Sequence, residues 1–271
     1  MSWCASKLGD ADFGDFRLTK RFTTLAQTML EHPGQSIPSA CSDWASSKAA
    51  YRFLHNDNVT PSKMLEPHLL RLKERCESHN VVLAVQDSNY LNLDSFRSMD
   101  GLGFIESSSK WSHKGLVFHP NVAFSTDGEC LGLLGYEIFS RQEKRKSSRH
   151  EYMRRPIQEK ESYRWIKSLK VNKMNIPSHI DVVTVADRES NPPADCNPIN
   201  WVLHTNYPIE SIEEACEKVN WYKIRWQIEI YFKVMKSGFR VEKNRFGDVK
   251  NLEKFIILIA ILATRVMNLT Y

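Results

Sequence analysis

Four side chains that can take part in chemistry occur at helical spacing between residues 222 and 236. The segment consists of helix formers without Pro or Gly, and Gly238 ends it, so the sequence predicts one helix here. At about 100° per residue, a phenol, a guanidinium, a carboxylate and an amine fall within about 60° of one another. These groups belong to Tyr222, Arg225, Glu229 and Lys236. A separate apolar stripe on the same helix would pack against a core and leave the polar face toward a cleft or solvent.

Glu229 needs partners, because a lone carboxylate binds a catalytic divalent metal poorly. Two apolar, β-branched runs each end in an aspartate, Asp87 in one and Asp187 in the other. Both runs are typical of buried strands. A buried carboxylate must be paired, metal-bound or hydrogen-bonded, although Asp87 could instead cap the turn that follows it.

Together the three carboxylates can hold two divalent metals at a phosphate group. Hard oxygen ligands select Mg²⁺ or Mn²⁺. In such a pair, one ion activates the attacking water or 3′-hydroxyl and the other stabilises the leaving oxygen. Asp87, Asp187 and Glu229 are therefore candidate catalytic residues and metal ligands, and the chemistry they indicate is phosphoryl transfer on nucleic acid.

The elements that must position these residues follow from hydrophobic periodicity. Helical spacing predicts an N-terminal lobe that could bind DNA through its basic residues or serve as a packing platform. Its helices are expected at residues 18–31, 43–54 and 60–79. Strands are expected at residues 81–87, 116–124, 130–139 and 181–187, and a further helix at about 158–171. Asp127-Gly128 lies between two β-rich runs and predicts a hairpin turn.

Composition limits the class of protein. A chain of 271 residues with 42% hydrophobic content suits one large or two modest domains with a real core. Its 6 cysteines show no CxxC or Cys/His spacing and the N-terminus has no apolar signal core, so we expect a reducing cytoplasm and no structural zinc. The apolar run 255–263 is too short to span a bilayer, so we expect a buried helix and no membrane role.

Positive charge is concentrated in two blocks, although the formal net charge is only +5. Residues 141–173 and residues 218–250 both carry a large excess of Lys and Arg over acidic residues. Basic density this local indicates a polyanionic partner, and a solvated surface is the alternative for either block alone.

The helix pattern Y-x2-R-x3-E-x6-K resembles the signature of bacterial DDE transposases of insertion sequence family four. The resemblance runs from about Trp3 to the C-terminus. The segments LGDADFGDFRLTKR and AAYRFLHNDNV resemble the family's N-terminal DNA-binding part. The segments VVLAVQDSNYL and VVTVADRES resemble the strands that carry its first and second catalytic aspartates.

The resemblance implies an α/β fold with an RNase-H-like mixed sheet flanked by helices over residues 80–271. A small all-helical DNA-binding lobe would precede it over residues 1–79. The implied cofactor is Mg²⁺, for which Mn²⁺ can substitute, bound by Asp87, Asp187 and Glu229. The implied partner is double-stranded DNA, both transposon ends and target, in the bacterial cytoplasm with nucleoid association when DNA is bound.

Matching positions also imply a set of DNA contacts. They are Tyr222, Arg225, Lys233, Lys236, Arg245 and Trp201. Arg would grip phosphates in a bidentate manner and Lys would act as a point charge. Trp201 stands where the family has a tryptophan that stacks on a flipped base, and a core strand aromatic is the alternative.

The implied function is cut-and-paste transposition through strand cleavage, hairpin formation and strand transfer. The chain departs from the family in two places. The interval between Asp187 and Glu229 is short and looks like an internal deletion, and the chain stops at Tyr271, before the segment through which family members dimerise. We expect the deletion to uncover a sheet edge, where the segment 201–205 would pair. A catalytically inactive remnant that only binds DNA is therefore the alternative function.

Overall fold

The N-terminal part of the chain is helical. The computed structural model describes residues 2–96, 98–105, 113–141, 154–187, 205 and 207–270. Its first helices are α1 (Trp3–Leu8), α2 (Phe16–Glu31), α3 (Ile37–Ala40), α4 (Trp44–Leu54) and α5 (Pro61–Cys76). Each starts at a Ser, Thr or Asp whose side chain accepts a backbone N–H of the first turn, a group the helix itself leaves unpaired. The three helices predicted for this region are confirmed as α2, α4 and α5.

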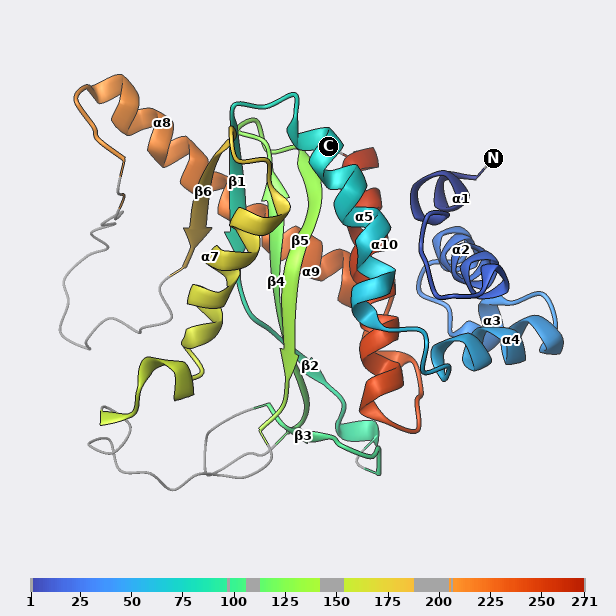
Figure 1. Cartoon of the computed structure of the whole chain (residues 1–271). Helices are drawn as coiled ribbons and strands as arrows, with labels where there is room; N and C mark the ends of the chain where they lie inside the picture. Colours follow the sequence, from blue (N-terminus) through green and yellow to red (C-terminus); the bar gives the residue numbers. More distant parts are fainter. Residues whose placement is uncertain are drawn as a thin grey trace.

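A mixed sheet with helices around it forms the rest of the described chain (Figure 1). The strands are β1 (Val81–Gln86), β2 (Asn89–Asn92), β3 (Gly103–Phe104), β4 (Lys114–Phe124), β5 (Cys130–Phe139) and β6 (Asp181–Ala186). The helices are α7 (Tyr163–Asn175), α8 (Ile212–Lys223), α9 (Gln227–Lys233) and α10 (Val249–Thr270). Short helical turns are η1 (Asp94–Phe96), η2 (Ile157–Glu159), η3 (Ile224–Trp226), η4 (Val234–Gly238) and η5 (Val241–Lys243).

β1 lies between strands of opposite sense. It pairs antiparallel with β4 on one side and parallel with β6 on the other. β4 and β5 form the predicted hairpin, and Gly128 in its turn has φ 91°, a left-handed conformation that favours glycine. Among the described strands, β6 pairs with β1 only, so it forms one edge of the sheet in this part of the chain.

Both faces of β1 are covered, which explains its continuous apolar sequence. Val82 and Ala84 pack in a core with residues of α5 and β5, whereas Leu83 and Val85 join the main core that includes α9 and α10. Successive side chains of a strand point to opposite faces, so each face receives alternate residues. Figure 1 shows α7 in front of the strands and α9 behind them.

The N-terminal helices are fixed to the sheet part through α10. Lys254 of α10 is buried, and its Nζ donates to the carbonyl oxygens of Leu54 at 2.7 Å and Asn56 at 3.0 Å. The apolar run 255–263 is buried within α10, as predicted, and none of the described helices is long and apolar enough to cross a membrane. The chain therefore presents its N-terminal helices and its sheet as one packed body.

Two predicted helices differ from the structure. The segment 222–236 is helical throughout but is not one regular α-helix, since α8 runs into the 3₁₀ turn η3, then α9, then the π-helical turn η4. The wider turn ends where the Phe239 N–H donates to the Val234 carbonyl, five residues back. α7 lies about five residues later than predicted, because residues 157–159 form the separate turn η2 after Pro156.

Candidate active site

Asp87 and Asp187 directly follow the ends of two neighbouring strands. β1 and β6 are in register, with Gln86 opposite Ala186, and each aspartate is the next residue of its chain segment. Parallel neighbours end at the same edge of a sheet, so the two carboxylates emerge at one place. The repeated sequence pattern thus has a direct structural counterpart.

Glu229 reaches the same place from α9. Ile228 and Tyr231 on this helix are buried, and the Tyr231 hydroxyl donates to the carbonyl of Ala260 in α10 at 3.0 Å. These contacts fix the rotation of α9 about its axis. Glu229 is therefore held on the side that faces the ends of β1 and β6, and with the two aspartates it forms what we call the carboxylate site.

One cationic nitrogen lies close to all three members of the carboxylate site. Nη1 of Arg225 lies 3.7 Å from Oδ2 of Asp87, 3.5 Å from Oδ2 of Asp187 and 3.8 Å from Oε1 of Glu229. The Arg225 side chain is only 14% exposed, against 21% for Asp87, 48% for Asp187 and 43% for Glu229. The structure thus brings together all three predicted metal ligands, and it places one predicted DNA contact among them.

The charge of Asp87 is disfavoured by its surroundings. Burial raises the pKa of Asp87 above its ordinary value, and the nearby Glu229 raises it further. The Ser88 N–H, which donates to Asp87 Oδ1 at 2.7 Å, opposes this shift, as does Arg225. Asp87 therefore caps its own turn and also belongs to the carboxylate site, so the two roles considered for it coexist.

A hydrogen-bonded network lies directly behind Asp87. Ser88 Oγ accepts from Nε of the buried Arg164 at 3.1 Å and lies 2.9 Å from Nδ1 of His119. The other ring nitrogen of His119 faces Oε1 of Gln86 at 3.3 Å. A neutral ring with its proton on Nε2 satisfies both contacts. The network ties the end of β1 to β4 and α7 and so fixes the turn that carries Asp87.

Comparison with known families identifies the class of protein. A family model described as Transposase DNA-binding matches residues 1–59, and one described as Transposase DDE domain matches residues 49–265, most of the chain. The chain belongs to the DDE transposases. The mixed sheet is thus the RNase-H-like sheet of a DDE domain, and the N-terminal helices correspond to the DNA-binding part of a transposase.

The carboxylate site of this transposase has the donor chemistry for a divalent cation, because three carboxylates from separate elements already surround one positive charge. Their oxygens lie 3.5–3.8 Å from Nη1 of Arg225, whereas Mg²⁺ takes oxygen ligands at about 2.0–2.1 Å. Within the described ranges, no three His, Cys, Asp or Glu side chains are already spaced to hold a metal ion. The carboxylates would have to move closer together around a bound metal.

The other predicted DNA contacts of the transposase differ in accessibility. Lys233 and Arg245 are exposed, and Tyr222 is half-buried. Lys236 is engaged within the protein, since its Nζ donates to the Tyr90 carbonyl at 2.9 Å and pairs with Glu242 at 3.2 Å.

Trp201, together with the segment 201–205 expected to pair at the sheet edge, lies outside the described residues except for Thr205.

Sequence reasoning missed three residues around the site. Ser88 and Arg164 form the network behind Asp87, and Trp226, next to Arg225, is a large aromatic with 63% of its surface exposed. The position of Ser88, directly after the aspartate that ends a predicted strand, could have indicated its role. The burial of Arg164 has no counterpart in the sequence pattern, because α7 is basic along much of its length.

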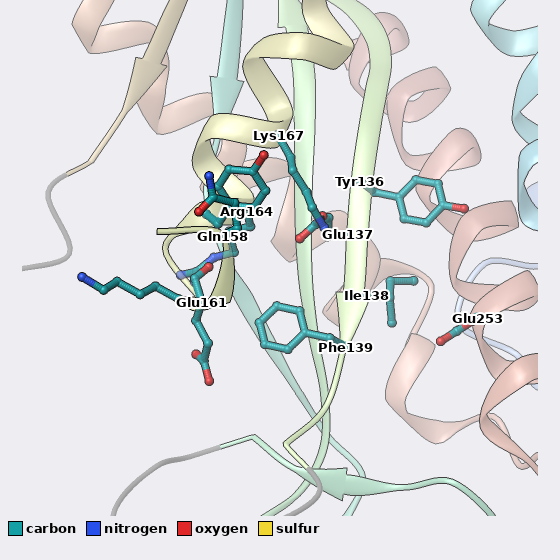
Figure 2. A pocket seen from close by; sticks show the side chains of 11 residues that line it. Tyr136, Glu137, Ile138, Phe139, Gln158, Glu161, Arg164, Lys167 and Glu253 are labelled. Carbon is teal, nitrogen blue, oxygen red and sulfur yellow. The ribbon is translucent and has the colours of Figure 1, made fainter. Parts of the chain in front are cut away.

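A pocket of about 350 Å³ lies elsewhere, between β5, the start of α7 and Glu253 of α10 (Figure 2). Arg164 lines it, but no member of the carboxylate site does. Lys167 crosses it to pair with Glu137 at 2.7 Å. The pocket is therefore separate from the carboxylate site, which is built from the strand ends and α9.

Proposed function

We propose that this transposase cleaves and joins DNA strands by metal-dependent phosphoryl transfer at the carboxylate site. The observation that carries the proposal is the convergence of Asp87, Asp187 and Glu229, from three different elements, on one cationic position. Divalent metal ions, Mg²⁺ or Mn²⁺, would supply activation of the attacking oxygen and stabilisation of the leaving oxygen. No side-chain nucleophile is required.

The roles of the chain's own residues follow from their positions. The three carboxylates would hold the cations, and the hydrogen-bonded network of Ser88, His119 and Arg164 fixes the turn that carries Asp87. Lys233 and Arg245 are exposed cations suited to backbone phosphates, and the exposed ring of Trp226 offers a surface on which a base can stack. These groups position DNA but do not read its sequence.

The finer assignment is cut-and-paste transposition of the type carried out by insertion sequence family four, with a hairpin intermediate, Trp201 stacking on a flipped base, and dimeric pairing of two transposon ends. The helix pattern of Tyr222, Arg225, Glu229 and Lys236 supports it. The short interval before Glu229 supports an internal deletion relative to that family. The partly exposed strand β6, which pairs on one side among the described strands, is consistent with such a loss.

A second candidate function is DNA binding without catalysis. It is favoured by the wide spacing of the carboxylates around Arg225 and by the position of Asp187 after an edge strand of the described sheet. In this case the N-terminal helices would still bind DNA. The carboxylate site would then remain too open to hold metal.

Cleavage assays separate the two candidates. The purified chain would be incubated with Mn²⁺ and a plasmid that carries the DNA flanking its own coding sequence. We expect nicked product from wild type and none from Glu229→Gln, with DNA binding retained by both in gel shifts. Asp127→Asn, in the exposed β4–β5 turn, is the matched control and should cleave as wild type does. DNA binding with no cleavage by wild type would support the second candidate.

A further inference from the structure

Arg225 occupies the electrostatic centre of the carboxylate site. Its Nη1 lies within 3.8 Å of an oxygen from each of the three acids, yet none of these distances is as short as a direct hydrogen bond. The guanidinium is thus held by the summed field of three acids and not by one bidentate pair. Its small exposure, 14% of the side chain, shows that it lies inside the site and not at its rim.

We propose that Arg225 is an exchangeable counter-ion that occupies the metal position of the DNA-free protein and leaves it when DNA and metal bind. The inference rests on the proposed metal chemistry of this site. In the DNA-free state Arg225 compensates the three negative charges. In the DNA-bound state its guanidinium pairs with a backbone phosphate and the carboxylates close around metal.

Charge and distance make the two occupants mutually exclusive. A metal held by these oxygens would lie within a few ångströms of Nη1, and two cations so close in a partly buried site repel strongly. Arg225 must therefore swing out for a metal to bind. A phosphate is a suitable destination because guanidinium binds phosphate oxygens in a fork and is more weakly hydrated than an ammonium group.

The position of Arg225 in its helix makes such a swing feasible. Arg225 belongs to the 3₁₀ turn η3, one turn before Glu229, and exposed Trp226 and Lys233 follow on the same helical segment. A rotation of the side chain toward these groups would bring the guanidinium to a surface already suited to DNA. The backbone of α9, fixed by Tyr231 and Ile228, would not need to move.

Exchange makes metal binding and DNA binding interdependent. Each ligand would bind more tightly in the presence of the other, by the same factor, because both favour the state with Arg225 displaced. Without DNA, Arg225 would keep the affinity for metal low. The protein would then assemble its cleavage site only on DNA.

Calorimetric titration with Mn²⁺ in the absence of DNA tests the exchange. We expect Arg225→Gln to bind Mn²⁺ more tightly than wild type, by a factor in the range of about 5- to 150-fold that is typical of coupled sites. Lys223→Gln is the matched control, because it removes one positive charge from the same helical segment at an exposed position that has no assigned DNA contact. Its Mn²⁺ affinity should stay within about twofold of wild type, since solvent screens exposed charges.

A second measurement does not depend on the Gln variant folding normally. DNA binding to wild type and to Arg225→Lys would be measured with a duplex of arbitrary sequence, with and without Ca²⁺, which occupies oxygen sites. Wild type should bind the duplex more tightly with Ca²⁺. The gain should shrink in Arg225→Lys, whose shorter ammonium cannot span three carboxylates.

The outcomes separate the exchange from the proposed function. If Arg225→Gln binds Mn²⁺ no more tightly than wild type, and Glu229→Gln does not bind it, the exchange is overturned but the metal site stands. If neither wild type nor any variant binds Mn²⁺, the exchange and the proposed metal-dependent function are both overturned. If Arg225→Gln and Lys223→Gln both bind Mn²⁺ more tightly than wild type, the effect is general electrostatics, and the exchange is overturned.

Discussion

The two aspartates of the carboxylate site follow strands of the same sequence pattern but lie in different surroundings. Asp87 follows β1, which has a strand on each side, and its side chain is 21% exposed. Asp187 follows β6, which among the described strands pairs on one side only, and its side chain is 48% exposed. The half of the site that contains Asp87 is therefore anchored between two strands, and the half that contains Asp187 lies at an edge of the described sheet.

The difference lies in the supporting contacts and not in the aspartates themselves. Behind Asp87, Ser88 links His119 and Arg164, so the turn is bonded to β4 and α7. Strand β6 is only partly buried along most of its length. The proposed metal chemistry therefore depends on how well Asp187 is held, because a metal site requires all its ligands at once.

The largest expected effect compares the two aspartates directly. Asp87→Asn and Asp187→Asn should each slow metal-dependent DNA cleavage by about a thousandfold or more, since a lost metal ligand removes several kcal/mol of transition-state stabilisation and about 4 kcal/mol corresponds to a thousandfold. Cleavage rates in Mn²⁺ measure this. Loss confined to Asp87→Asn would show that the edge aspartate does not serve the site.

The network behind Asp87 should make the anchored half sensitive to acid. Burial, followed by the nearby Arg164, lowers the pKa of His119 to about 3 from 6.5. Between these values the unfolded chain binds a proton that the folded chain does not, so the free energy of unfolding falls as the pH is lowered through this window. Each pH unit below 6.5 costs about 1.4 kcal/mol, or about 2 kcal/mol at pH 5.

Urea unfolding of wild type and His119→Gln at pH 7.5 and pH 5 checks this expectation. The stability advantage of wild type should decrease by about 2 kcal/mol between the two conditions, because glutamine does not titrate. A constant difference would mean that His119 is protonated in the folded protein at pH 5. The neutral tautomer assigned to the network would then be wrong.

Core packing should show the same contrast on a smaller scale. Val82 of β1 and Val182 of β6 are register partners, but Val82 is fully buried whereas Val182 is partly buried. Val82→Ala should lower the free energy of unfolding by about 2 kcal/mol, from lost transfer free energy and a cavity. Val182→Ala should cost about 1 kcal/mol or less. Equal losses in urea unfolding would show that β6 is as well covered as β1.

Much of the fold could be predicted from the sequence because each of these elements is specified by a short run of adjacent residues. Capped helices, the Asp-Gly turn and the two strands that end in aspartate each follow from a few adjacent residues. The convergence of Asp87 and Asp187 could only be hypothesised, because it depends on the register between strands that lie a hundred residues apart. Register is set by the packing of both faces and has no short sequence pattern.

The side-chain details of the site were harder to predict for the same reason. Arg225 was expected on one helix face with Glu229 and, from the family resemblance, in contact with DNA. In the structure it lies among all three carboxylates, a position set jointly by β1, β6 and the 3₁₀ turn before α9. Lys236 was grouped with it by helical spacing. In the structure, which holds no DNA, the π-helical turn η4 and the short strand β2 bring its amine to the Tyr90 carbonyl. The contact of Lys236 with DNA stays a prediction.

The smallest expected effect separates two lysines of one helical segment. Lys233 is exposed, so Lys233→Gln should weaken DNA binding and reduce the dependence of log affinity on log salt by about one, the value for one lost phosphate contact. Lys236 is already bonded to Tyr90 and Glu242. Lys236→Gln should therefore leave the salt dependence unchanged and lower the melting temperature, because it releases β2 next to Asp87. A reduced salt dependence in Lys236→Gln would instead show that the Lys236 amine of wild type contacts DNA in the complex, as the family pattern implies. DNA binding would then also rearrange the contacts that hold the Asp87 half of the site.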